Sequence, residues 1–344
     1  MPLRVPFTWS DDCLRHDPAG EVWVGVRTPG SEVAARAEAI RTALLAAGAR
    51  QVAAAPHDDA PLAAVHDAEL LAFLREIWAD WAAAGIPSDR VVPYVFAHRE
   101  LTSSPRVPSA VWARPGSFVY DTMTLVGPGT WEAARAAVDV ALTAVDLVVG
   151  GEPLAYACCR PPGHHALRRA FGGSCYLNNT AVTASELVRR LGGGPVAVVD
   201  IDAHHGNGTQ ELFAGRSDVR TASVHVDPGA GWFPHFLGFA DESDEANLNL
   251  PLPPGTGDDG WLGAVAEAAS FADGAEALVV ALGVDAAAAD PESPLVVTEA
   301  GYRQAGRILG ALGVPTVVVQ EGGYELATIG SLVVAALEGL ETAE

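Results

Sequence analysis

Hydrophobic residues along the chain form two kinds of pattern, which alternate from the N-terminus to the C-terminus. Short apolar runs rich in Val, Leu and Ala predict strands at residues 22–26, 51–55, 155–159, 196–199, 219–226, 277–284 and 315–320. Longer stretches with apolar residues at helical spacing predict helices at residues 32–47, 61–84, 131–149, 174–191, 258–272, 298–313 and from about 326 onward. This alternation predicts an α/β fold with a mostly parallel central sheet that is covered by helices on both faces.

The chain shows no internal repeat and no linker, so we expect one domain over residues 1–344. Residues 86–128 interrupt the pattern, because they are rich in proline and aromatic residues and show little periodicity. A loop of this length in a compact domain usually has a function. We therefore predict a proline-rich insertion near the active-site mouth that walls a pocket or pairs two subunits.

Composition and charge narrow the classes of function. No stretch reaches the roughly eighteen apolar residues of a membrane span, and Met1–Asp12 lacks the basic and apolar regions of a signal peptide. The net charge is −22 and all 21 basic residues are Arg, so the chain should repel nucleic acid and favour a cationic substrate. The four cysteines show no disulfide spacing, which indicates a reducing compartment, and the Ala- and Arg-rich composition without Lys resembles that of a GC-rich bacterial gene. We therefore expect a protein of the bacterial cytoplasm.

Ionisable residues are concentrated directly after the predicted strand at 196–199, where Asp200, Asp202, His204 and His205 follow one another closely. Ligands of open α/β sheets bind beyond the carboxyl ends of strands. Residues i and i+2 of an extended segment share a face, so Asp202 and His204 can point at one metal ion, such as zinc or iron(II). The alternative is a helix cap, but buried charges need partners, which favours the metal.

Asp285 follows another apolar strand and would give three protein ligands together with Asp202 and His204. Three protein ligands leave a position open for water and substrate, as in catalytic zinc sites. By itself, Asp285 could equally be a helix N-cap after a strand.

Two further strand ends carry candidate catalytic groups. His164 and His165 lie in a loop with two prolines and a glycine, and a pair in such a loop favours acid/base chemistry, whereas a single histidine would favour a core residue. Tyr324 follows two glycines, which indicates a side chain held where backbone passes close to a ligand. The alternative for Tyr324 is an aromatic turn residue.

Four motifs in this order resemble the zinc-dependent histone deacetylase-like amidohydrolases, and among them the acetylpolyamine amidohydrolases. They are Arg160–Ala166 (RPPGHHA), Val199–Thr209 (VDIDAHHGNGT), Leu282–Asp285 (LGVD) and Glu321–Tyr324 (EGGY). Shorter segments also fit the acetylpolyamine branch, namely Pro128–Ala134, Phe171–Gly173, Tyr176–Asn179 and Trp232–Gly238. The resemblance extends from about residue 65 to the C-terminus, and it implies the arginase/deacetylase-like fold.

The resemblance also implies roles for individual residues. Asp202, His204 and Asp285 would bind one zinc ion, and His164, His165 and Tyr324 would be the catalytic residues. Behind them, Asp200 would orient His164 and, with Ser223 and main-chain carbonyls, help to hold a structural potassium ion. Asn207 stands behind the second histidine, where many protein deacetylases have aspartate.

The substrate tunnel departs from the family pattern at one position. Such tunnels usually hold the acyl chain between two aromatic residues; Phe233 fits one, but Ser174, next to Gly173, stands where the other is expected. The tunnel is therefore wider on that side or is filled by a residue from the 86–128 segment. In this family acidic residues at the tunnel mouth select polyamines, and Glu100 and Asp121 are candidates by location only.

The predicted function is a zinc-dependent amidohydrolase that deacetylates small N-acetylated amines, preferably acetylpolyamines, and releases acetate and the free amine. A protein deacetylase that acts on acetyl-lysine by the same mechanism and a non-catalytic homologue that binds acylated amines are the alternatives. A binuclear manganese ureohydrolase would need a further carboxylate, but Ala286 and Ala287 follow Asp285. We expect a small cationic substrate, a homodimer, and neither nucleic acid nor membrane as partner.

Overall fold

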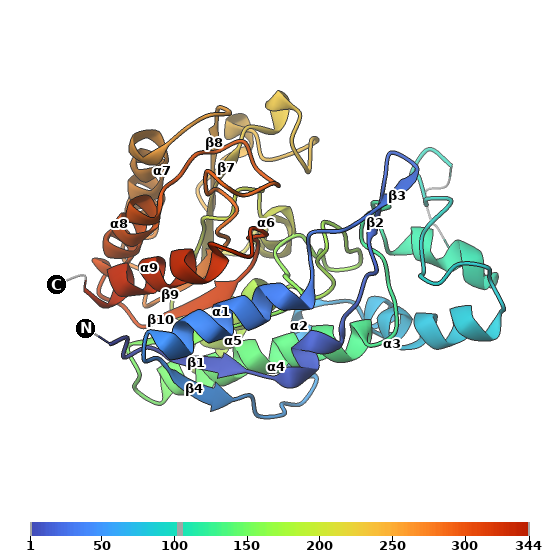
Figure 1. Cartoon of the computed structure of the whole chain (residues 1–344), viewed down its shortest axis with the longest axis horizontal. Coiled ribbons are helices and arrows are strands. Elements are labelled where there is room, and N and C mark those ends of the chain that lie inside the picture. Colours follow the sequence, from blue (N-terminus) through green and yellow to red (C-terminus); the bar gives the residue numbers. More distant parts are fainter. Residues whose placement is uncertain (1, 102–105, 343–344) are drawn as a thin grey trace.

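The computed structural model describes residues 2–101 and 106–342 and has a central sheet of eight strands. In spatial order these are β4 (Arg50–Ala53), β1 (Pro6–Trp9), β5 (Leu154–Ala157), β10 (Thr316–Gln320), β9 (Ala277–Leu282), β6 (Val196–Asp200), β7 (Val219–Val226) and β8 (Asn247–Leu252). Every neighbouring pair in this sheet is parallel. The prediction of an α/β fold with a parallel sheet is confirmed (Figure 1).

Helices cover both faces of the sheet. One face packs against α2 (Ala60–Val65), α3 (Ala68–Ala83), α4 (Thr130–Val149), α5 (Asn179–Arg190) and α6 (Asn207–Phe213), and the other against α1 (Ala34–Ala46), α7 (Asp258–Phe271), α8 (Glu299–Gly310) and α9 (Ile329–Glu341). Side chains of β6 alternate between the two cores: Val196 and Val198 join the first, Ala197 and Val199 the second. Strands buried on both faces explain the continuous apolar runs in the sequence.

The predicted strand at 22–26 is not part of this sheet. It forms a separate antiparallel hairpin of β2 (Glu21–Trp23) and β3 (Val26–Thr28), with Gly25 in the turn at φ 80°. The side chains of Trp23 and Val24 are 51% and 82% exposed, so this apolar run faces outward. The sheet's first strand is instead β1, which has a proline and a buried threonine and so lacks a clear apolar run.

Capping residues account for two further differences. The predicted helix at 61–84 is divided between α2 and α3, because the side chain of Asp67 accepts a hydrogen bond from the Glu69 N–H and begins a new helix. The predicted helix at 174–191 begins only at Asn179, where Asn178 caps the Ala181 N–H. Asn178 and Asp67 belong to the residue types that favour helix N-caps over helix interiors.

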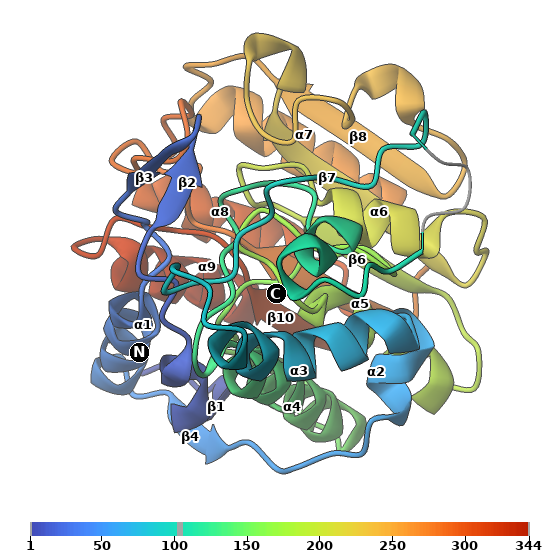
Figure 2. The same cartoon turned by 90° about the vertical axis from the view of Figure 1, so that its right-hand side faces the viewer.

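Residues 86–128, in the part of the segment that the structure describes, contain one short helical element, the 3₁₀ helix Val111–Ser117. The segment lies beside the β2–β3 hairpin at one end of the molecule, as Figures 1 and 2 show. Val22 and Thr122 join the two through a pair of hydrogen bonds. The remaining short 3₁₀ helices are Asp11–Arg15, Pro228–Ala230 and Ala240–Glu242.

Within residues 2–101 and 106–342, no helix is both long enough and apolar enough to cross a lipid bilayer.

Candidate active site

The predicted site residues follow four strands that are neighbours in the sheet, in the order β5, β10, β9 and β6. Because these strands are parallel, the loops after their carboxyl ends meet at one edge of the sheet. The loop after β5 carries the two histidines, the loop after β6 carries Asp202 and His204, and those after β9 and β10 carry Asp285 and Tyr324. The structure therefore brings together residues that are far apart in the chain.

Asp202, His204 and Asp285 form a compact group with one ligand atom each, and these atoms lie within 4.8 Å of one another. His204 Nδ1 is 3.2 Å from Asp202 Oδ1 and 3.0 Å from Asp285 Oδ2. Backbone N–H groups fix the carboxylates, since Gly322 donates to Asp202 Oδ2 at 2.7 Å and Ala203 donates to Asp285 Oδ1 at 2.8 Å. One imidazole and two carboxylates are a donor set that fits zinc and leaves a coordination position open.

The charges of this group also favour a divalent cation. Burial and the nearby charge of Asp202 raise the pKa of Asp285 to about 7. Burial also opposes the charge of Asp202, but His164 and His204 outweigh it and hold the pKa of Asp202 below its ordinary value. Two buried carboxylates this close repel each other, and a metal ion between them removes that repulsion.

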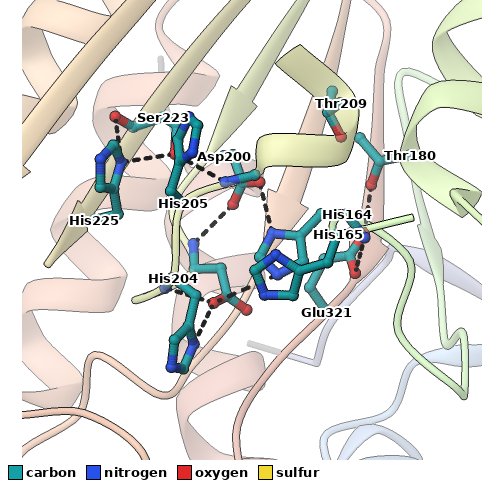
Figure 3. A network of polar contacts seen from close by, with 12 residues as sticks. His164, His165, Thr180, Asp200, His204, His205, Thr209, Ser223, His225 and Glu321 are labelled. Carbon is teal, nitrogen blue, oxygen red and sulfur yellow. Dashed lines mark hydrogen bonds and ion pairs between the residues drawn. The ribbon is translucent and has the colours of Figure 1, made fainter. Parts of the chain in front are cut away.

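His164 and His165 lie beside each other with their rings tilted by 45° and the ring centroids 4.0 Å apart (Figure 3), and each Nδ1 has its own partner. His164 Nδ1 is 2.9 Å from Asp200 Oδ2, and His165 Nδ1 is 2.6 Å from Asn207 Oδ1. These contacts agree with the supporting positions that the resemblance implied for Asp200 and Asn207. They leave Nε2 of each ring as the nitrogen available to a reaction.

The pKa values of the two imidazoles are shifted in opposite directions. Burial disfavours the charged form of His164, but Asp202 and Asp200 raise its pKa to about 10. Burial, His164 and His204 together hold the pKa of His165 well below its ordinary value. The two pKa shifts are opposite in direction, so the charged form is favoured at His164 and the neutral form at His165, an arrangement that suits acid/base chemistry.

Tyr324 is held by Arg36, a residue that the sequence analysis missed. The Arg36 guanidinium carbon lies 4.5 Å from the centre of the Tyr324 ring, and the guanidinium donates to the carbonyl oxygens of Glu321 and Gly323. Glu32 in turn binds Arg36 at 3.0 Å. Burial raises the pKa of the Tyr324 phenol although Arg36 opposes this, so the hydroxyl remains a hydrogen-bond donor.

A cavity of about 270 Å³ connects these residues with the surface. His165, His204, Tyr324, Phe233, Gly173 and Ser174 line it together with Met123, which belongs to the 86–128 segment. Gly173 packs against both His165 and Phe233, because a Cβ atom at this position would lie 2.3 Å and 2.9 Å from them. The segment thus contributes a wall residue, Met123, beside the small Ser174.

Three glutamates line this cavity, of which Glu32 is buried and Glu21 and Glu292 are partly exposed. None of them was a candidate in the sequence analysis. Of the two earlier candidates, Asp121 is buried and accepts hydrogen bonds from the backbone of Gly173, Met123 and Thr124. Glu100 is exposed beside Arg99 and is not among the described residues that line the cavity.

Ser223 and Asp200 are partners in the β6–β7 ladder. Ser223 Oγ lies 2.9 Å from Nδ1 of His225, whose ring is tilted against that of His205 with the ring centroids 4.6 Å apart (Figure 3). His205 Nε2 contacts Gln210 at 2.8 Å and Asn249 at 3.2 Å. His205 is therefore a buried residue of the scaffold, although the sequence places it next to a ligand candidate.

Comparisons with known proteins agree with this geometry. The family model of the histone deacetylase domain matches residues 31–340. The chain is 39% identical to the acetylpolyamine amidohydrolase of Mycoplana ramosa, over 98% of this chain and 99% of the relative. It is 38% identical to acetylpolyamine amidohydrolase 1 of Pseudomonas aeruginosa, over 97% and 98% of the two chains. The crystal structure of acetylpolyamine aminohydrolase from Burkholderia pseudomallei matches with a TM-score of 0.91 and 36% identity, over 98% and 99% of the chains. The resemblance that the motifs indicated is confirmed, and the chain belongs to the histone deacetylase family.

Proposed function

We propose that this protein is a zinc-dependent amidohydrolase that removes acetyl groups from small cationic N-acetylated amines, preferably acetylpolyamines. The observation that carries the proposal is the grouping of Asp202, His204 and Asp285 with the tandem histidines and Tyr324 around one cavity. Two partly exposed glutamates that line this cavity suit a substrate with a distal ammonium group. Relatives named as acetylpolyamine amidohydrolases, matched over nearly their full length, support the choice of substrate.

In the proposed mechanism, Asp202, His204 and Asp285 would hold zinc, which would supply Lewis acidity to the amide carbonyl and to the attacking water. His165, the neutral imidazole, accepts a proton from the water as its oxygen bonds to the carbonyl carbon. Tyr324 donates a hydrogen bond to the carbonyl oxygen as negative charge develops there. The C–N bond then breaks, a proton passes from the histidine pair to the leaving nitrogen, and acetate and the amine are released.

The proposal is tested by turnover of N-acetylputrescine, N-acetylcadaverine and an acetyl-lysine peptide at equal concentrations. We expect the two small cationic substrates to have the higher kcat/KM. Activity on the peptide alone would contradict the substrate assignment and favour the protein deacetylase. A zinc-loaded protein that is inert toward every acetylated amine would favour the non-catalytic homologue.

Glu292→Gln should raise KM for N-acetylputrescine about 10-fold with little change in kcat, because a charge-assisted contact to the distal ammonium is worth roughly 1–2 kcal/mol. The uncharged analogue N-butylacetamide has no ammonium group and cannot make this contact. The kcat/KM of Glu292→Gln on this analogue should therefore stay within about 2-fold of the wild-type value. Steady-state kinetics on both substrates measures the difference.

Glu245→Gln is the matched control, since Glu245 is exposed and carries the same charge outside the cavity. Equal effects of the two substitutions would show that Glu292 does not bind the ammonium group. An equal loss of kcat/KM on the uncharged analogue would show the same.

Asn207→Asp should move the acidic limb of the pH profile of kcat/KM to higher pH. Asn207 is the Nδ1 partner of His165, and a carboxylate in its place favours the charged imidazole and raises the pKa of His165 by about one unit or more. His165 accepts a proton only when neutral, so on the acidic side activity should be lost at a higher pH than in wild type, whereas activity at pH 8.5 should change little. An acidic limb at the same pH in both proteins would contradict the assignment of His165 as the base.

The structure also suggests how the protein associates. We propose a homodimer in which the β2–β3 hairpin and the 86–128 segment meet the second copy, because Trp23, Val24, Phe96 and Phe236 are exposed around one apolar cavity there. A monomer in analytical ultracentrifugation would contradict this.

We further propose a cytoplasmic location, which the four free buried cysteines support. We also propose a structural potassium ion near Asp200 and Ser223, which are partners in the β6–β7 ladder. The dependence of Tm on potassium concentration tests this ion.

A further inference from the structure

Glu321 is a fully buried carboxylate to which the proposed mechanism gives no role. It directly follows β10 and precedes the two glycines and Tyr324. Burial raises the pKa of Glu321 to about 7. A carboxyl group in such a place is costly unless its oxygens are bound, so its partners indicate what it does.

Three donors bind the two oxygens of Glu321 (Figure 3). Oε2 accepts hydrogen bonds from the backbone N–H of Gly163 at 2.6 Å and of His164 at 3.0 Å. Oε1 accepts a hydrogen bond from the Thr180 hydroxyl at 2.6 Å, in the first turn of α5. The two N–H groups belong to the turn that presents the tandem histidines, and buried backbone donors of this kind require acceptors.

The backbone around Glu321 is bound to the other half of the site. The Glu321 carbonyl oxygen accepts a hydrogen bond from Arg36 at 2.7 Å, and Arg36 also contacts the Tyr324 ring. The next N–H, that of Gly322, donates to Asp202 at 2.7 Å. One residue therefore links the loop of Tyr324, through its backbone, with the loop of His164 and His165, through its side chain.

We propose that Glu321 is a positioning residue whose carboxylate holds the His164–His165 turn in register with the Tyr324 loop. The histidines and the phenol then face the same amide group. We call the hydrogen bonds that join these two loops through Glu321 the clamp. The effect on catalysis rests on the proposed function, whereas the clamp itself does not.

A second metal site is the competing interpretation, since His164, Cys175 and Glu321 offer ligand atoms within 4.8 Å of one another. The hydrogen bonds around Glu321 disfavour a metal ion at this place. Both oxygens of Glu321 already accept hydrogen bonds, from three donors in total. Burial also raises the pKa of the Cys175 thiol well above its ordinary value, which disfavours the thiolate that a metal needs.

The central experiment compares Glu321→Leu with Glu321→Gln. Leucine removes the acceptors at similar size, and we expect kcat on N-acetylputrescine to fall about 100-fold with KM nearly unchanged, as for a misplaced catalytic group. Glutamine keeps an oxygen for both N–H groups and should retain at least about a third of the wild-type kcat. Zinc content should stay equal in wild type and both variants.

Thr180 keeps the proposal testable if Glu321→Leu does not fold. Thr180→Val removes one hydrogen bond to the carboxylate and should lower kcat roughly 3- to 10-fold, whereas Thr180→Ser keeps the hydroxyl and the activity. Thr183→Val is the matched control, because Thr183 lies one turn later in α5 and its hydroxyl donates to the Asn179 carbonyl oxygen instead. We expect no change in kcat for this control.

Hydrogen–deuterium exchange gives a readout that does not depend on turnover. The amides of Gly163 and His164 should exchange slowly in wild type and in Glu321→Gln, and faster in Glu321→Leu or Thr180→Val. Unchanged exchange in all variants would overturn the clamp even if the wild type deacetylates none of the substrates. Equal loss of kcat in Glu321→Leu and Glu321→Gln, or a zinc content that falls with either, would also overturn it.

Discussion

Tyr324→Phe should lower kcat by about 10²- to 10³-fold, the range found when one donor to a developing oxyanion is removed. KM should change much less, because the hydroxyl interacts more strongly with the transition state than with the bound substrate. The substitution keeps the contacts that hold residue 324 in place. The ring lies against Arg36 and the backbone N–H donates to Asp290 at 2.6 Å, and neither contact uses the hydroxyl.

Steady-state kinetics of the variant should therefore be accompanied by zinc analysis and thermal unfolding, both of which should match wild type. A kcat within a factor of three of wild type, at equal zinc content, would remove Tyr324 from the catalytic residues. If Tm fell together with kcat, the loss would reflect packing around Arg36 rather than the missing hydroxyl.

The sequence allowed the centre of the site to be predicted because two physical signals coincide there. Continuous apolar runs identify strands that are buried on both faces, and charged residues directly after such runs need partners. Asp202, His204 and Asp285 were found in this way, and the structure places their ligand atoms within 4.8 Å of one another. The site residues meet because β5, β10, β9 and β6 are neighbouring parallel strands, so their carboxyl ends lie at one edge of the sheet.

The outer part of the site could not be predicted by the same signals. The apolar run at 22–26 has the pattern of a buried strand, but its side chains are exposed and it forms a hairpin at the cavity. Glu21 in this hairpin meets Glu292 from the loop after β9 only through the tertiary fold. No local pattern marks two distant glutamates as neighbours, and the candidates chosen by location, Glu100 and Asp121, are not among the described residues that line this cavity.

The buried charges behind the site were missed for a related reason. Arg36 lies on α1 and Glu321 lies in a recognised motif, but charged residues are usually exposed, and nothing in the sequence indicates that both are buried. Their partners are mostly backbone groups, such as the carbonyl oxygen of Gly323 and the N–H of Gly163. Backbone partners are the same for every residue type, so a sequence pattern contains no signal for them.

Asp285→Asn should abolish both zinc binding and turnover, with kcat/KM lower than wild type by more than about 10³-fold, since in the proposed mechanism the metal would stabilise the charge that develops on the carbonyl oxygen. An amide is a much weaker zinc ligand than a carboxylate, and only Asp202 and His204 remain. Asparagine has nearly the same shape and keeps an oxygen that can accept the Ala203 N–H, so the loop after β9 should persist. Zinc should raise Tm of the wild type, because it binds the folded state, but not that of the variant.

Metal analysis after dialysis, combined with Tm with and without added zinc, separates loss of the ligand from loss of the fold. Asp259→Asn is the matched control, because Asp259 is an exposed residue of α7 and its substitution changes the net charge equally. A variant that still binds one zinc ion per chain and keeps its turnover would show that Asp285 is no ligand. Asp285 would then be the helix-cap type of residue that its sequence context alone allows, and the metal site would need a different third donor. Loss of turnover with zinc still bound would instead make Asp285 a residue that orients His204, through their 3.0 Å contact, rather than one that holds the metal.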